Sequence, residues 1–160
     1  MQGTEFDEGE FFRAVAASGA RTLLIGRRAM VAYGLPVLTA DYDLWIDADD
    51  AAALNAALAP LGLRPSRSPD DARQAGRYVL ENDEHVDVLV ARSGLPVDGV
   101  RVAFADVWAR RKLLRFDAST SIAVPCLDDL ILTKRWAMRD KDVADIRLLQ
   151  ALKAQTEGGT

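Results

Sequence analysis

The segment LLIGRRAMVAYGLPVLTADYDLWID, residues 23–47, holds the pattern around which the rest of the chain is organised. An apolar run ends at Gly26, a short helical pattern follows, and a second apolar run begins directly after two aspartates, Asp41 and Asp43. The second run is short and rich in β-prone residues, which predicts a strand over residues 43–46. Side chains two positions apart on a strand share a face, so we expect both carboxylates to point the same way.

This segment also suggests a kind of chemistry. Two carboxylates that lie this close repel each other unless a cation or a proton sits between them. Gly26 stands where a strand turns into a helix, and helix N-termini attract anions. A cation site facing an anion site indicates chemistry on a metal-bound phosphate. The Asp-x-Asp spacing also occurs elsewhere in the chain, so it is the position of Asp41 and Asp43 behind the glycine turn that supports the inference.

Size and composition limit the class of protein. The chain has 160 residues, of which 49% are hydrophobic, so it can form one packed domain, and disorder is not expected. A net charge of −4 gives no general attraction to nucleic acid. Cys126 is the only cysteine, which excludes an internal disulfide and favours a reducing cytoplasm. The N-terminus is acidic and polar, unlike a signal peptide, and no apolar run is long enough for a membrane span, so we expect no membrane association.

The order of apolar patterns predicts a single domain over residues 1–160, of α/β or α+β class, with a small mixed sheet flanked by helices. We expect strands at residues 22–25, 43–46, 77–81, 86–90, 100–103 and 121–124. We expect helices at residues 5–18, 28–33, 49–58, 104–114, 127–138 and 141–153. Asp49 is expected to cap the third helix, residues 61–71 to form a loop and residues 93–99 a turn, with frayed ends at 1–4 and 155–160.

Asp87 is the third carboxylate of interest. It interrupts the apolar run HVDVLV at residues 85–90, where the valines share one face of a strand and Asp87 and Leu89 share the other. An acid inside such a strand is costly unless it is paired or binds a metal; the alternative is an edge strand with Asp87 in water. His85, the only histidine, is interpreted as a turn residue.

Several motifs resemble one known family. Ile25-Gly26-Arg27, thirteen further residues and Asp41-Tyr42-Asp43 resemble the signature of the polymerase-β-type nucleotidyltransferases. That signature has an apolar residue, Gly, Gly or Ser, a gap of about this length, and Asp-x-Asp or Asp-x-Glu. The flanking residues, and the closing segments 127–134 and 139–146, are similar to small bacterial members, including those tied to toxin–antitoxin systems. One residue departs from the pattern, because Arg27 stands where the family has a second small residue.

The resemblance implies a nucleotidyltransferase fold with a helical C-terminus. It also implies a Mg²⁺- or Mn²⁺-dependent transfer of a nucleoside monophosphate from an NTP, such as ATP, to an acceptor hydroxyl. The implied catalytic and metal-binding residues are Asp41, Asp43 and Asp87. Three carboxylates can hold two such ions, one to activate the attacking oxygen and one to steady the leaving pyrophosphate. The implied phosphate-binding residues are Gly26, Arg27 and Lys134. The acceptor, whether protein, RNA or small molecule, is left open.

Alternatives remain for the two cations and for the whole chain. Arg27 either donates to a phosphate, or fills the pocket and abolishes catalysis, or lies on the surface. Lys134 either reaches a phosphate or belongs to a solvated, charged helix pair in which Asp142 and Asp145 are tied to arginines. For the whole chain, the rival function is a catalytically silent nucleotidyltransferase-fold protein that acts by binding. A cognate toxin or antitoxin, or a second copy in a homodimer, would then be its partner.

Overall fold

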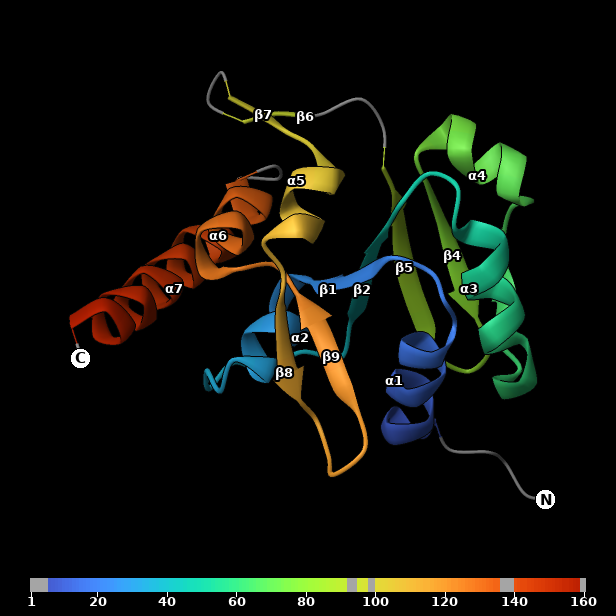
Figure 1. Ribbon diagram of the computed structural model, residues 1–160, viewed down its shortest axis with the longest axis horizontal. Helices are drawn as coiled ribbons and strands as arrows, with labels where there is room; N and C mark the ends of the chain where they lie inside the picture. Colours follow the sequence, from blue (N-terminus) through green and yellow to red (C-terminus); the bar gives the residue numbers. More distant parts are fainter. Residues whose placement is uncertain (1–5, 92–94, 98–99, 136–139, 159–160) are drawn as a thin grey trace.

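The structure is a computed structural model that describes residues 6–91, 95–97, 100–135 and 140–158. A five-stranded mixed sheet in the order β1-β2-β5-β4-β3 forms its centre (Figure 1). Only the central β2–β5 pair of this sheet is parallel. The strands of the sheet are β1 (Thr22–Ile25), β2 (Tyr42–Ile46), β3 (Arg64–Pro65), β4 (Arg77–Glu81) and β5 (His85–Val90). Two antiparallel pairs follow, β6 (Leu95–Val97) with β7 (Val100–Val102), and β8 (Lys112–Arg115) with β9 (Ser121–Val124).

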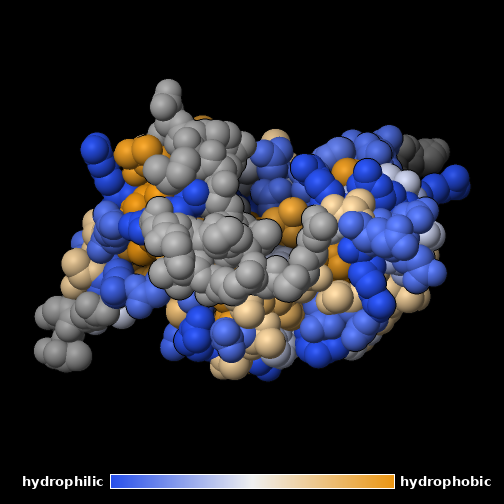
Figure 2. Space-filling view, turned by 90° about the horizontal axis from the view of Figure 1, so that it is seen from above, coloured by the Kyte–Doolittle hydropathy of each residue, from blue (hydrophilic) through white to orange (hydrophobic). Residues whose placement is uncertain are grey.

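Helices surround this sheet, and Figure 1 places α6 and α7 on the opposite side of the molecule from α3 and α4. The helices are α1 (Glu8–Ala17), α2 (Gly26–Ala32), α3 (Ala51–Leu58), α4 (Pro69–Ala75), α5 (Phe104–Ala109), α6 (Leu127–Arg135) and α7 (Asp140–Gly158), with a short 3₁₀ turn at Ala59–Leu61. Within the described ranges, no helix is both long and apolar enough to cross a lipid bilayer. Figure 2 shows that hydrophilic side chains dominate the visible surface around α4.

The alternation of side chains along β1, β2 and β5 divides the interior into two cores. Leu24, Leu44 and Val88 point into the larger core, where phenylalanines of α1 and leucines of α3 cover that face of the sheet. Leu23, Ile25 and Trp45 point to the other face and pack against α5 through Phe104 and Val107. The second face is therefore only partly covered by apolar side chains, and it is the face that carries Asp43 and Asp87.

The expected fold class is confirmed: the chain is an α+β domain with a mixed sheet, flanking helices and a helical C-terminus. The hairpin of β4 and β5 is also confirmed. His85 is the first residue of β5 and not a turn residue, because it pairs with Glu81 across the hairpin. The predicted turn at residues 93–99 lies mostly outside the described residues, and its middle forms β6. Residues 1–4 and 136–138, for which fraying and helix were predicted, also lie outside them.

Four local predictions were wrong. The helix expected over residues 104–114 ends at Ala109, and β8 follows because it pairs with β9. The loop expected over 61–71 contains the start of α4, whose first turn Ser68 caps by accepting from the backbone N–H of Asp71. Asp50, not Asp49, precedes α3, and its side chain makes no cap. Helix α7 continues to Gly158, so most of the predicted frayed tail is helical.

Candidate functional site

Asp43 and Asp87 lie side by side on the partly covered face of the sheet. β2 and β5 run parallel, and their register pairs Asp43 with Asp87. Neighbouring strands lie about 4.8 Å apart and register partners project to the same face, so the two carboxylates face the same space. Both residues are partly exposed, whereas Tyr42, Leu44 and Val88 beside them are buried. The sheet therefore presents two neighbouring acids to solvent on an otherwise apolar scaffold.

Gly26 completes this part of the site because of its position opposite Asp43. β1 ends at Ile25, which is the register partner of Asp43, and Gly26 turns the chain into α2 with φ +69°. A Cβ atom at Gly26 would lie 2.5 Å from Oδ2 of Asp43, which no ordinary contact allows. The positive φ is also a conformation that residues with a side chain rarely adopt. Glycine thus allows the Asp43 carboxylate to lie directly against the backbone of the turn.

Asp41 is placed differently from the other two acids. It precedes β2 and is exposed; its backbone N–H donates to Thr39 Oγ1 (3.0 Å), and its carbonyl accepts from Arg28 Nε (3.3 Å). Over the described part of the chain, no group of three or more His, Cys, Asp or Glu side chains is arranged to hold a metal ion. The structure thus pairs Asp43 with Asp87 but does not gather all three acids into one group, because the strand begins at Tyr42 and Asp41 belongs to the preceding loop.

His85 is a polar neighbour of the site that the sequence did not identify. Its Nε2 lies 3.3 Å from Asp87 Oδ1, and its Nδ1 lies 3.2 Å from Glu81 Oε2. Glu81, together with Asp87, raises the pKa of the His85 imidazole. Arg77 Nη2 also lies 3.9 Å from Asp87 Oδ1. The sequence did contain one signal for this contact, because His85 and Asp87 are two residues apart on one strand and therefore share a face. Their other neighbours depend on the hairpin register.

Arg27 and Lys134, the two cations expected to contact phosphate, both bind Asp145 of α7. Arg27 donates from Nε and Nη2 to the two carboxylate oxygens of Asp145, each at 3.1 Å. Lys134 Nζ donates to Asp145 Oδ2 at 2.9 Å and lies 3.9 Å from Asp142 Oδ1. The Asp145 side chain is 1% exposed and that of Lys134 is 6% exposed. As in the second alternative for Lys134, Asp145 of the closing helices is tied to an arginine, but the cluster is buried rather than solvated, and Lys134 itself is the second partner.

The electrostatics of this cluster follow from the charges around Asp145. Burial alone would raise the pKa of its carboxyl group, but the hydrogen bonds from Arg27 and Lys134 outweigh burial and lower it. The same hydrogen bond to Asp145 raises the pKa of Arg27. Asp145 is therefore a carboxylate at neutral pH, and it holds the cations of two other helices.

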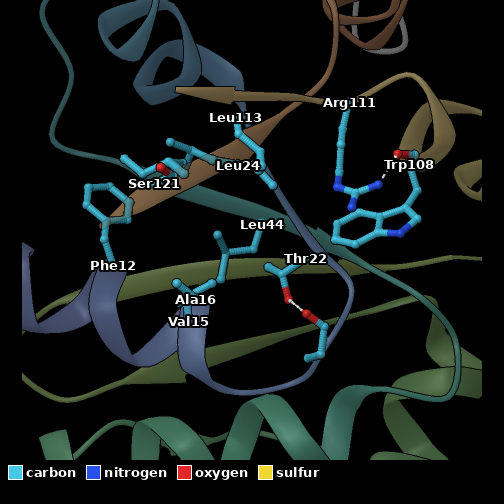
Figure 3. A pocket seen from close by; sticks show the side chains of 13 residues that line it. Phe12, Val15, Ala16, Thr22, Leu24, Leu44, Trp108, Arg111, Leu113 and Ser121 are labelled. Atoms are coloured by element: carbon cyan, nitrogen blue, oxygen red, sulfur yellow. Dashed lines mark hydrogen bonds between the residues drawn. The ribbon is translucent and has the colours of Figure 1, made fainter. Parts of the chain in front are cut away.

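A cavity of about 210 Å³ lies elsewhere, between α1, β1 and the β8–β9 pair (Figure 3). Thr22, Leu24 and Leu44 line it, and they project to the face of the sheet opposite Asp43. Arg111 stands at another side, with its guanidinium 4.0 Å from the Trp108 ring centroid. Because the β1–β2 sheet separates this cavity from Asp43 and Asp87, it is not part of the carboxylate site.

The fold of the chain is recognised from the arrangement of these residues on the sheet. A glycine turn after the first strand, an aspartate on the next strand of the sheet and a second aspartate in register beside it occur on a mixed sheet closed by two helices. This is the fold of the nucleotidyltransferases.

Several solved structures share this fold. TM1012 from Thermotoga maritima, assigned as a nucleotidyltransferase, matches with a TM-score of 0.55 and 15% identity over 94% of this chain and 88% of its own. The antibiotic-resistance factor ANT(2″)-Ia matches in its solution structure with a TM-score of 0.63 and 16% identity, over 92% of this chain and 83% of its own. Its crystal structure with adenylyl-2″-tobramycin matches with a TM-score of 0.59 and 17% identity, over 92% of this chain and 88% of its own. No family model and no curated protein matches the sequence.

Proposed function

We propose that this protein moves a nucleoside monophosphate from an NTP to an acceptor hydroxyl and releases pyrophosphate, in the cytoplasm. One observation carries the proposal: Asp43 lies against the glycine of the β1–α2 turn, with Asp87 in register beside it. Like charges directly opposite each other on neighbouring strands destabilise a sheet, and a bound metal ion would offset that repulsion. The nucleotidyltransferase fold of the chain supports the same function.

Asp43 and Asp87 fit a divalent cation such as Mg²⁺ or Mn²⁺. Both offer carboxylate oxygens, both are partly exposed, and Mg²⁺ is commonly held by one or two carboxylates together with substrate phosphates. When bound, such an ion would offset the negative charge of the triphosphate and of the attacking oxygen. We propose Asp41 as a further ligand on the loop side, which requires its exposed side chain to turn toward Asp43.

The residues of the chain itself have separate tasks in this proposal. Gly26 leaves space beside Asp43, so that a phosphate group can approach the backbone of the turn. Asp87 is held at one oxygen by His85, which fixes the orientation of its carboxylate toward the acceptor hydroxyl. The partly exposed position of both acids on one sheet face leaves an open approach for substrate.

We propose a small-molecule hydroxyl as the first acceptor class to test. The complex of ANT(2″)-Ia with adenylyl-2″-tobramycin shows that this fold can accommodate a nucleotidyl group on a small molecule. The net charge of −4 disfavours a long RNA acceptor, although a local contact with RNA or protein is compatible with it.

Calorimetric titration with each Mg²⁺·NTP tests the proposal without knowledge of the acceptor. We expect the parent to bind at least one NTP and Asp43→Asn or Asp87→Asn to bind more than about tenfold more weakly, since the substitution removes a charge facing the cation. Asp49→Asn is the matched control, because Asp49 is exposed and pairs with Arg73 far from the site. Equal affinity in Asp43→Asn and Asp49→Asn would refute the site.

The second candidate function is a nucleotidyltransferase-fold protein that binds a partner and has lost catalysis. The observation that favours it is the lack of a three-acid metal group over the described part of the chain, together with Arg27 at the usual small position. A cognate toxin or antitoxin, or a second copy of the chain, would be the partner. This candidate predicts that the parent binds no Mg²⁺·NTP in the same titration.

A further inference from the structure

We propose that Arg27 is a positioning residue that joins the nucleotide-binding turn, the loop before Asp41 and helix α7, and that it is not a phosphate ligand. The inference rests on the proposed nucleotide site, because it assigns a task to the residue next to Gly26. It explains why an arginine can stand where a small residue is usual.

The first step concerns the direction of the Arg27 side chain. Its guanidinium donates three hydrogen bonds to other parts of the chain than β2: two go to Asp145 of α7 and one goes from Nη1 to the carbonyl of Leu38, at 3.1 Å. The two bonds to Asp145 use the fork of the guanidinium, a geometry that lysine cannot reproduce. Arg27 therefore spans from α2 to α7 and to the loop.

The second step concerns the anchor at the far end. Asp145 is 1% exposed and also accepts from Lys134 of α6, so its carboxylate cannot move without leaving Lys134 partly unpaired. A buried charge that loses its partner is strongly destabilising, which makes the anchor rigid. Asp142, 2% exposed, lies 3.9 Å from the same lysine. Arg27, Lys134, Asp142 and Asp145 thus belong to one charged cluster, and Arg27 connects it to the Gly26 turn.

The third step concerns the loop that carries Asp41. Arg27 holds the carbonyl of Leu38, and its neighbour Arg28 donates to the carbonyls of Thr39 (3.0 Å) and Asp41 (3.3 Å). The two arginines at the start of α2 thus donate hydrogen bonds to three carbonyls of the segment that leads into β2. Loss of Arg27 would release the Leu38 end of this loop and the Gly26 turn at the same time.

A double-mutant cycle on NTP affinity separates positioning from direct phosphate contact. If Arg27 acts through Asp145, then Arg27→Ala and Asp145→Asn should each weaken Mg²⁺·NTP binding by about tenfold, and the double variant should be no weaker than either single variant. Arg27→Lys should also lose affinity, because it keeps the charge but loses the fork. If Arg27 instead contacts phosphate, Asp145→Asn should free it and leave affinity equal or higher, and Arg27→Lys should retain most of the binding. Either of these results would overturn the proposal.

Arg110 offers a matched structural control. It makes a similar forked pair with a buried acid, Asp129 of α6, at 2.9 and 3.1 Å, but it contacts neither the turn nor the loop. Arg110→Ala should lower the stability of the fold without the change in NTP affinity. If Asp145→Asn does not fold, the NTP affinities of Arg27→Lys and Arg110→Lys can be compared instead, since both variants retain the charge and leave the acid intact.

Hydrogen exchange separates failure of this inference from failure of the proposed function. In the ligand-free protein, Arg27→Ala should speed amide exchange at residues 26–29 and 38–41, and Arg110→Ala should not. If the parent binds no NTP, the proposed function fails while this exchange pattern still decides whether Arg27 holds the turn and the loop. Unchanged exchange at both segments in Arg27→Ala would refute the positioning role directly.

Discussion

At the scale of single residues, Gly26 is the position on which the site depends most directly. Two independent facts require glycine there, the positive φ and the close approach of Asp43 Oδ2. Gly34 has a similar φ of +91°, but a Cβ atom at Gly34 would meet nothing within 4 Å. The two glycines can therefore be compared directly: both need the left-handed backbone conformation, but only Gly26 also lies against another residue.

Gly26→Ala and Gly34→Ala should separate these two requirements. The backbone requirement alone should lower the free energy of unfolding by about 1–2 kcal/mol in each variant, because alanine is disfavoured in the left-handed region. Gly26→Ala should cost more than that, since the new methyl group displaces the Asp43 carboxylate, and it should also abolish NTP binding. Urea denaturation and calorimetry measure the two effects. Equal losses of stability and normal binding in both variants would show that the contact with Asp43 has no importance.

At the scale of elements, one ion pair fixes the start of β1 against the start of α3. Arg21 donates to Asp50 through its backbone N–H (2.7 Å) and its guanidinium (2.9 and 3.2 Å). The side-chain hydrogen bond from Arg21 lowers the pKa of the Asp50 carboxyl group. The Asp50 side chain is 14% exposed and that of Arg21 is 47% exposed, so only the acid of this pair is shielded from solvent.

Asp50 should make stability depend on pH in a defined direction. Its pKa is lowered in the folded state, so the stabilisation is fully present above the unfolded value of about 3.9 and is lost as the pH falls through the folded value. Urea midpoints of the parent and Asp50→Asn should therefore differ at pH 6, begin to converge below about pH 4, and meet only once the pH has fallen through the folded pKa of Asp50. Asp49→Asn, which changes the neighbouring acid, should show less of this dependence. A difference that persists unchanged in acid would mean that Asp50 acts by something other than its charge.

At the scale of the whole molecule, substrate binding should be visible in global stability. A ligand that binds only the folded state stabilises it by about 2.7 kcal/mol at a hundredfold excess over Kd. Because the site joins β1, β2 and β5, and Arg27 links it to α7, we expect one cooperative transition that moves as a unit when Mg²⁺·NTP is added. Denaturation followed by fluorescence and by far-UV circular dichroism measures this shift. Two separate transitions, with only one moved by nucleotide, would show that α6 and α7 unfold independently of the sheet.

Local sequence patterns predicted much of the fold for clear reasons. The alternation in HVDVLV corresponds to β5, because its valines are buried on one face and period two follows directly. The short run after Asp43 corresponds to β2, whose residues Leu44, Trp45 and Ile46 are buried on both faces. The β8 strand was missed because its burial is slight and it exists only through pairing with β9. Helix α4 was missed because its capping serine follows a stretch rich in proline and glycine that resembles a loop.

The sequence alone determined that Asp43 and Asp87 would lie on apolar strands and that a glycine turn would precede Asp43. It also determined the fold class, since periodicity and turn residues act over a few positions. Only the tertiary structure decided the register that sets Asp43 beside Asp87 and the partner of Arg27. Arg27 and Asp145 are 118 residues apart, and the chain offers many other acids. No local pattern selects one carboxylate among them, because that choice depends on how helices pack in three dimensions.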